Sequence, residues 1–365
     1  MINRIHKPKD CINNRYEIIS FIGEGGMQEV FKAKDLVLQR EIALKVPKNR
    51  SAVKRFQRSA IVSAKVNHPN VAKTLDYFKT DSYEYLIEEL IVGRDLKEVI
   101  QKEFKCLDPY LVSRVFHHLA KGLAASHHAE VIHRDLKPSN VMVGGGATLS
   151  ELKITDFGIA KMAADEISQA IEGGESSMSA SKTVVGAVPY MAPETLETQN
   201  FASKSSDIWS LGAMAYELLS GKKPFGEGVG LFKTMMAINE AALPPKPEYI
   251  NENLQFKSIG EAIYEIILSC LKKDPSLRPT ADELVRNCES LCYSTVERKQ
   301  GRVQNLTRSN QGFIRSEDGS EVFFHFDSVY GEKPVVGSKV SFAQFIGSPR
   351  DRAHPVVVMR DEENI

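Results

Sequence analysis

The 365-residue sequence lacks any apolar run that approaches the roughly 20 residues needed to cross a membrane. Its N-terminal segment carries charges and no apolar core follows them, which is not the pattern of a secretory signal. We therefore expect a cytoplasmic protein with no membrane partner. An excess of either charge is also missing, because Lys+Arg and Asp+Glu both number 47. The chain as a whole thus has no electrostatic attraction to nucleic acid or to an acidic membrane surface.

Cysteine is scarce as well, with five residues in the whole chain and no paired spacing. This number fits reduced thiols in a reducing compartment rather than a disulfide framework. Cys288 and Cys292 are four residues apart on an expected helix, a spacing that can hold a metal ion. No His or second Cys pair completes such a site, so we favour buried thiols there.

The order of the secondary-structure patterns predicts an α+β fold of two lobes followed by a small all-β unit. Alternating apolar and polar residues predict strands first, and helical periodicity comes later, which argues against an alternating βαβ sheet. We expect strands within 16–47, 72–79, 83–90 and 301–358, helices at 51–66, 95–130 and through most of 195–293, a Gly/Ser-rich loop at 173–183 and a polar linker at 294–300.

Two features in the first strands are consistent with phosphate binding. Gly23 and Gly25 lie in a turn before a strand that starts near Val30, and glycines there let backbone N–H groups approach phosphates, although tight turns in sheets are the commoner cause. Lys45 follows Ala43 in an apolar strand. A lysine in this setting either meets an anion or reaches water at the edge of a sheet. Taken alone, these residues leave both interpretations open.

The segment HRDLKPSN, which ends at Asn140, favours the interpretation that Lys45 meets an anion. Asp135 can accept a proton from a hydroxyl, and Lys137 can neutralise a migrating phosphate. Asn140 can supply an oxygen to Mg²⁺, and Asp156, in the tripeptide DFG, can supply a second. For a single Asp, a cap or turn is the more frequent role. Phosphoryl transfer needs mainly positioning and charge neutralisation, and this ordered set offers both.

With these motifs the sequence resembles the eukaryotic-type (Hanks-type) Ser/Thr protein kinase family over residues 15–293. The motifs occur in family order: the Gly-rich turn, Ala-Leu-Lys45, HRDLKPSN, DFG, Ala192-Pro-Glu194, Asp207-Ile-Trp-Ser-Leu-Gly212 and Arg278-Pro-Thr. The resemblance implies a bilobal fold, with a small lobe at about 15–92 and a large lobe at about 93–293. It also implies that ATP and Mg²⁺ bind in the cleft and that protein hydroxyls receive the phosphoryl group.

The resemblance assigns a role to each motif residue. Lys45 contacts the α- and β-phosphates, Asp135 is the catalytic base, and Asn140 and Asp156 are the metal ligands. Lys137, in this form of the motif, is typical of Ser/Thr-specific members. The residues implied to surround the nucleotide are Gly23, Gly25, Val30, Ala43, Lys45, Glu89, Asn140 and Asp156.

Other assignments are structural or regulatory. Glu194 is expected to pair with Arg278 and brace the large lobe, and Asp207 to bond the backbone of the catalytic loop. In this family the Arg before the catalytic Asp, here Arg134, often receives a phosphate from the activation loop. The candidate acceptors, each equally consistent with a solvated linker residue, are Ser176, Ser177, Ser179, Ser181 and Thr183.

The sequence departs from the family at three points. Gln28 replaces the third glycine of the loop, and Ala187 replaces a threonine that normally bonds the catalytic Asp and Lys, which is expected to loosen both. The helix glutamate that normally pairs with Lys45 is also absent, because its position is Ser59 and residues 51–66 contain no acid. Glu88 aligns with the position that normally forms the back wall of the ATP pocket. It either reaches Lys45 in place of the missing acid, points to solvent, or is displaced by one residue in this alignment.

Residues 301–360 resemble a cold-shock domain, a five-stranded barrel of the OB type, through GFI at 312–314, DG at 318–319 and VFFHF at 322–326. The resemblance implies a platform on which bases stack, each worth about 1–3 kcal/mol. Its residues would be Phe313, Phe323, His325 and Phe326. About three of the family's rings are missing, at Asn305, Leu306 and Gln311, and residues 299–365 carry nine basic and nine acidic side chains. Weak single-stranded nucleic-acid binding, protein docking and a structural role stay open.

We thus expect an autophosphorylating Ser/Thr protein kinase with an appended cold-shock-like module. The alternatives are a nucleotide-binding pseudokinase scaffold and a nucleic-acid sensor whose kinase lobes report occupancy.

Overall fold

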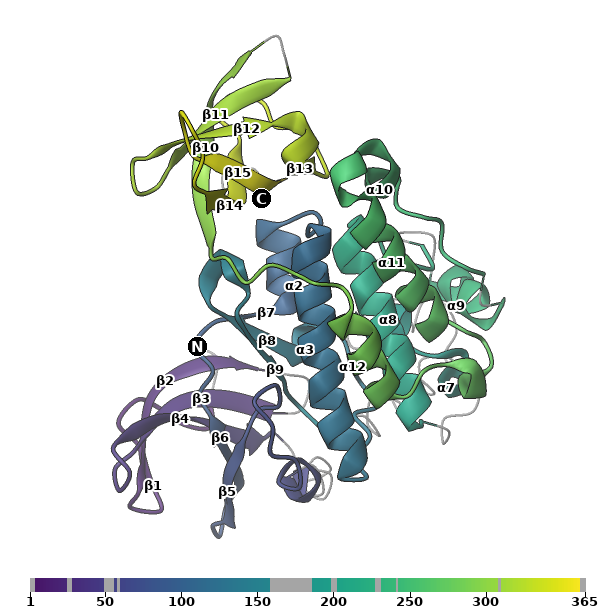
Figure 1. Ribbon diagram of the computed structural model, residues 1–365. Coiled ribbons are helices and arrows are strands. Elements are labelled where there is room, and N and C mark those ends of the chain that lie inside the picture. Colours follow the sequence, from purple (N-terminus) through teal and green to yellow (C-terminus); the bar gives the residue numbers. More distant parts are fainter. Residues whose placement is uncertain are drawn as a thin grey trace.

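The computed structural model shows a small lobe built on one sheet, a helical large lobe and a C-terminal barrel (Figure 1). This arrangement confirms the predicted bilobal α+β fold. The residues that the structure describes are 4–24, 28–48, 56–57, 60–157, 186–197, 202–226, 231–240, 242–307 and 310–361. Gly25, Ser59 and the five candidate phosphorylation sites lie outside these residues.

The small lobe is an antiparallel six-stranded sheet with the order β1-β2-β3-β4-β6-β5. Its strands are β1 (Cys11–Ile12), β2 (Tyr16–Glu24), β3 (Gln28–Asp35), β4 (Arg40–Pro47), β5 (Thr74–Lys79) and β6 (Glu84–Glu89). Ile42, Leu44 and Val46 on β4 are buried in an apolar core on one face of this sheet. Because side chains alternate along a strand, Ala43 and Lys45 project from the opposite face.

The large lobe packs its helices around one extended core. Its helices are α2 (Leu96–Glu98), a π-helical turn at Val99–Glu103, α3 (Pro109–His128), α7 (Pro193–Glu197), α8 (Lys204–Ser220), α9 (Leu231–Glu240), α10 (Glu248–Glu252), α11 (Leu254–Cys270) and α12 (Ala281–Glu289). A small sheet of β7 (Arg94–Asp95), β8 (Val141–Gly144) and β9 (Glu151–Ile154) lies beside α3. Among the described residues, no helix is long and apolar enough to cross a membrane.

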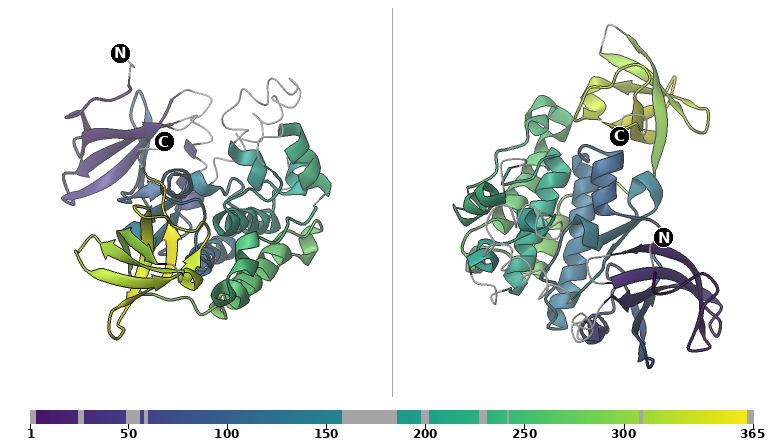
Figure 2. Two further views of the ribbon diagram at one scale, coloured as in Figure 1. Left: turned by 90° about the horizontal axis from the view of Figure 1, so that it is seen from above. Right: turned by 180° about the vertical axis from the view of Figure 1, so that it is seen from behind.

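The C-terminal unit is a closed five-stranded barrel with one short extra strand. Its strands are β10 (Arg298–Thr307), β11 (Gln311–Ser316), β12 (Glu321–His325), β13 (Val329–Tyr330), β14 (Lys339–Phe345) and β15 (Arg352–Val358). Their order is β12-β11-β10-β14-β15-β13, and a pairing between Phe323 of β12 and Arg352 of β15 closes the barrel. The barrel and the small-lobe sheet lie at opposite ends of the molecule, with α2 and α3 between them (Figures 1 and 2).

Two expected boundaries differ from the structure. The helical pattern at 95–130 is interrupted before α3, because Asp108 caps the start of that helix and accepts hydrogen bonds from the N–H groups of Tyr110 and Leu111. The predicted linker at 294–300 includes the start of β10, so its last three residues are strand. Residues 295–297 are exposed, as a linker would be, whereas Arg298 is buried and enters an ion pair.

The barrel is joined to the large lobe by buried polar contacts. Arg298 of β10 donates to Asp108 over 3.0 Å, and the two side chains are 4% and 0% exposed. The Tyr330 hydroxyl donates to the carbonyl oxygen of Leu219 at 2.9 Å. Asn253, at the start of α11, donates to three backbone carbonyls of the barrel. These contacts specify one docked position.

Apolar contacts extend the same interface. Tyr330, Val357 and Met359 of the barrel belong to the core of the large lobe rather than to the barrel's own core. The His354 ring stacks on Phe256 of α11, with ring centroids 5.3 Å apart. The barrel is therefore packed as part of the large lobe and not suspended on a linker.

We predict that Arg298→Ala destabilises the chain by about 3–5 kcal/mol, because removing one partner leaves the Asp108 carboxylate buried without its counter-charge. Denaturant unfolding of the full chain measures this change. Lys299→Ala is the matched control, since its ion pair with Asp318 lies on the surface and little change is expected. Equal stability of the two variants would contradict the prediction.

A second prediction concerns pH. Burial, with smaller contributions from the charges of Arg114 and Lys121, lowers the pKa of His118 from 6.5 to about 4. The unfolded chain therefore takes up this proton first on acidification, and stability is lost as the pH falls from about 6.5 to about 4. His118→Gln should reduce the slope of the free energy of unfolding against pH in this range by the equivalent of about one proton. Denaturation at a series of pH values measures the slope, and an unchanged slope would refute the assignment.

Candidate active site

One face of the small-lobe sheet carries the side chains that line the cleft. Val30 pairs with Lys45 across β3 and β4, and Ala43 pairs with Glu88 across β4 and β6. Paired residues lie on the same side of a sheet, and Gln28, two residues before Val30, shares that side. The sheet thus presents Gln28, Val30, Ala43, Lys45 and Glu88 together.

Lys45 reaches two carboxylates across this cleft. Its Nζ lies 2.7 Å from Glu88 and 2.8 Å from Asp156, and the Lys45 and Glu88 side chains are 9% and 6% exposed. The expectation that Glu88 reaches Lys45 is confirmed, and the alternative that Glu88 points to solvent is wrong. The edge-strand interpretation of Lys45 is wrong as well, because the amine is buried among anions rather than in water.

The charges of this cluster follow from burial and pairing. Burial lowers the pKa of Lys45, but Asp156 and Glu88 outweigh it, so the pKa lies above its ordinary value and the ammonium is retained. Burial raises the pKa of Asp156, yet Lys45 and the amide of Gln28 overcome this and hold it below its usual range. Burial dominates at Glu88, whose pKa is raised. Asp156 is therefore the more firmly ionised of the two carboxylates.

The catalytic loop brings three predicted residues together in the large lobe. Lys137 Nζ lies 2.7 Å from the Asp135 carboxylate. Asn140 Nδ2 donates to the carbonyl oxygen of Asp135 at 2.7 Å and to its Oδ2 at 3.1 Å. This triad is in contact although Ala187 supplies no hydroxyl to it. Whether the loss of that hydroxyl loosens Asp135 and Lys137 stays a prediction.

The Asp207 side chain binds the backbone of this loop. Its carboxylate accepts from the N–H groups of His133 and Arg134, both at 2.9 Å, and contacts His127 Nε2 at 2.9 Å. Arg134 has a left-handed backbone, with φ of 71°, which is uncommon in a non-glycine residue, and the Asp207 carboxylate binds its N–H. The predicted structural role of Asp207 is confirmed.

The two predicted metal ligands come from neighbouring segments. The N–H of Thr155 donates to the carbonyl oxygen of Asn140 at 2.9 Å, which places Asp156 beside Asn140. His133 Nε2 contacts the Thr155 carbonyl oxygen at 2.9 Å, and its ring packs on Phe157 with centroids 4.7 Å apart. The HRDLKPSN and DFG segments are thus fixed to each other.

The donor set fits a magnesium ion bound together with phosphates. Because Nδ2 of Asn140 faces Asp135, its Oδ1 is directed elsewhere and is the atom available to a cation. One amide oxygen and one carboxylate leave most coordination positions to phosphate oxygens and water, as Mg²⁺ prefers. Within the described residues no group of three or more His, Cys, Asp or Glu side chains could hold a metal. Cys288 is buried as expected, but the expectation of a buried thiol is wrong for Cys292, which is exposed because α12 ends before it, at Glu289.

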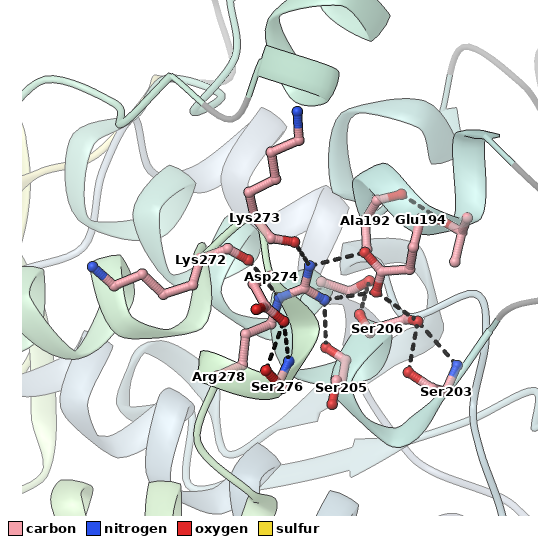
Figure 3. Close-up of polar contacts among 12 residues, drawn as sticks. Ala192, Glu194, Ser203, Ser205, Ser206, Lys272, Lys273, Asp274, Ser276 and Arg278 are labelled. Carbon is pink, nitrogen blue, oxygen red and sulfur yellow. Dashed lines mark hydrogen bonds and ion pairs between the residues drawn. The ribbon is translucent and has the colours of Figure 1, made fainter.

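Glu194 and Arg278 brace the large lobe as predicted (Figure 3). The guanidinium binds both carboxylate oxygens, at 2.7 and 2.8 Å, and its side chain is fully buried. It also donates to the carbonyl oxygens of Ser205, Lys272 and Lys273. The pair ties the segment before α8 to the segment before α12, away from the reacting groups.

The remaining nucleotide-lining assignments have different outcomes. Val30 and Ala43 lie on the cleft face of the sheet, and Gly23 pairs with Val30 on the neighbouring strand. The Glu89 carboxylate binds Lys153 at 2.8 Å, so its side chain links β6 to β9. Its role at the nucleotide stays a prediction.

Sequence reasoning missed the contact of Gln28. Its Nε2 donates to Asp156 Oδ1 at 3.1 Å, and the side chain is buried. The available signal was its position: a polar residue capable of donating stands where the family has a glycine. What the sequence could not show is that this side chain turns inward to the metal-ligand carboxylate.

The four predicted stacking residues of the barrel do not form one open platform. Phe313 and Phe323 lie edge to face, with centroids 5.8 Å apart, and the Arg350 guanidinium covers Phe313 at 5.0 Å. His325 is partly exposed and contacts Asp327 at 3.1 Å. Phe326 instead packs against the barrel core, and its carbonyl oxygen accepts from Asn253 of the large lobe.

Comparisons with known proteins agree with this geometry. The sequence model of the protein kinase domain matches residues 16–288. A probable serine/threonine-protein kinase of Clostridium perfringens is 32% identical over 77% of this chain and 38% of its own length. Serine/threonine-protein kinase PrkC of Bacillus subtilis is 29% identical over 75% of this chain and 40% of its own. The chain spans less than half the length of either relative.

The fold has a solved counterpart in a crystal structure of Rad53 residues 1–466 in complex with AMP-PNP. That structure superposes with a TM-score of 0.58 at 23% identity, over 75% of this chain and 64% of the other. The chain belongs to the protein kinase family, and its kinase domain is of the serine/threonine class.

Proposed function

We propose that this chain transfers the γ-phosphoryl group of ATP to Ser and Thr hydroxyls of proteins, its own included. The observation that carries the proposal is the convergence of Lys45 from the small lobe with Asp135, Asn140 and Asp156 from the large lobe. Every side chain that such a transfer requires at the phosphates, the metal and the hydroxyl is therefore present.

The residues divide the chemistry among them. The Asp135 carboxylate orients the acceptor hydroxyl and takes its proton, and Lys137, already 2.7 Å from Asp135, neutralises the phosphoryl group as it moves. Lys45 holds the α- and β-phosphates. Asn140 and Asp156 would hold Mg²⁺, which when bound supplies neutralisation of the phosphate charge.

The pseudokinase alternative makes the opposite prediction for one substitution. Asp135→Asn keeps the shape of the side chain and removes the proton acceptor, so transfer of label from ATP should fall by about a hundredfold to ten-thousandfold. Nucleotide affinity, measured by calorimetry with Mg²⁺, should change little. Equal labelling of both proteins, or none in the wild type despite nucleotide binding, would favour the scaffold. Mass spectrometry of the purified chain identifies any residue that it phosphorylates itself.

We propose a second function for the barrel, as a cold-shock-like OB-type unit that binds single-stranded nucleic acid weakly. The favouring observation is a row of side chains around its outer surface. Phe313 pairs with Phe323, Phe323 with Arg352, and Arg352 with Phe345 across successive strands. Arg350 lies over the first ring. Rings next to guanidinium groups suit stacked bases and a phosphate backbone.

Phe323→Ala is expected to weaken binding of a short single-stranded oligonucleotide about fivefold or more at low salt, as the loss of one stacked base implies. Fluorescence anisotropy with the full chain measures the affinity. Val335→Ala, on the exposed loop before β14, serves as the control. If the wild type shows no binding, the barrel is instead a protein-docking or structural unit.

A further inference from the structure

A carboxylate for Lys45 is missing from the segment where its relatives would place one. Residues 51–66 contain no Asp or Glu. A buried ammonium that must hold phosphates needs a fixed anion, because an unpaired charge in a desolvated cleft is strongly unfavourable. Among the described residues, the carboxylates in contact with Lys45 are those of Glu88 and Asp156.

Asp156 alone is poorly suited to that task. It belongs to the large lobe, and its carboxylate is also the metal-ligating group of the site. A cation bound between Asp156 and the phosphates would compete with Lys45 for the same oxygens. Gln28 already donates to Asp156 Oδ1 as well, so this carboxylate has a second donor that can orient it. Glu88 has no such conflict.

The sheet register determines the position of Glu88. Ala43 lies directly opposite Glu88, and Lys45 is two residues further along β4 on the same face. Diagonal neighbours of this kind are roughly 7–8 Å apart at Cα, a distance that a Lys and a Glu side chain can span. The observed separation is 2.7 Å between Nζ and Oε2. Since β4 and β6 are paired along their length, both ends of the ion pair belong to one rigid element.

The described part of the neighbouring helical segment packs against the sheet through apolar side chains. Residues 60–63 are helical, and Phe56 and Ala60 pack with Leu86 of β6 in a small apolar cluster. A displacement of this segment would expose apolar surface but would leave the Lys45–Glu88 pair unchanged, because neither partner lies on it.

We infer that Glu88 is the residue that positions Lys45 for the phosphates, so that this anchor is built entirely within the small-lobe sheet and does not depend on the position of the helical segment. The inference rests on the proposed phosphoryl transfer only for its kinetic consequence. Glu88 acts through Lys45 and is a positioning residue rather than a catalytic one.

The test compares two isosteric substitutions on β6. Glu88→Gln should lower kcat/KM for ATP about tenfold to a hundredfold, as is typical when a residue that orients a ligand-binding side chain is lost. This loss should appear as a higher KM for ATP, while KM for the protein substrate stays unchanged. Glu84→Gln removes a buried carboxylate from the same strand, one that pairs with Lys79, and should leave both parameters near wild type. Glu88→Asp, which keeps the charge, should recover part of the loss.

A double-mutant cycle that combines Glu88→Gln with Lys45→Met separates a positioning role of Glu88 from damage to the fold. Affinity for MgADP, measured by calorimetry on the full chain, should fall with Glu88→Gln when Lys45 is present and should not change further when it is absent. An equal loss in both backgrounds, or wild-type kinetics for Glu88→Gln, would overturn the inference. If Glu88→Gln does not fold, Glu88→Asp is measured in the same cycle. Absence of transfer by the wild type would remove the proposed function, while the affinity cycle would still decide the role of Glu88.

Discussion

The site depends on one buried ammonium. Lys45 lies between Glu88 of its own sheet and Asp156 of the large lobe, at 2.7 and 2.8 Å. Such a charge is tolerated in a desolvated cleft only when anions surround it, so the two carboxylates and the amine stabilise one another. The same contact joins the two lobes at the point where phosphates would bind. The contact between the lobes and the proposed phosphate site therefore depend on the same three side chains.

Two further sets of contacts hold the opposing groups of the large lobe at that point. Asp207 fixes the backbone under Asp135, and the backbone bond between Thr155 and Asn140 places the metal ligands side by side. The Asp207 bonds join segments more than seventy positions apart, whereas the Thr155–Asn140 bond joins two neighbouring segments. A site made in this way is pre-organised, because little has to move when charge develops on the phosphate.

The C-terminal barrel packs against the large lobe at the end opposite to the small lobe (Figure 1). Its residues Tyr330, Val357 and Met359 complete the apolar core of the lobe, and Arg298 supplies the counter-charge to a buried helix cap. The barrel is therefore packed as part of the large lobe and is not an independent domain joined by a flexible linker.

The sequence by itself determined the two-lobe order, the strands within 16–47 and the identities of Lys45, Asp135, Asn140 and Asp156, because alternation, helical period and contiguous motifs are local properties of the chain. It also suggested Glu88, since a missing acid implied a substitute. Tertiary structure decided what local patterns cannot encode. It showed that Gln28 turns toward Asp156 and that Arg298 is buried against Asp108. Both contacts join residues more than one hundred positions apart, and only packing brings them within hydrogen-bonding distance.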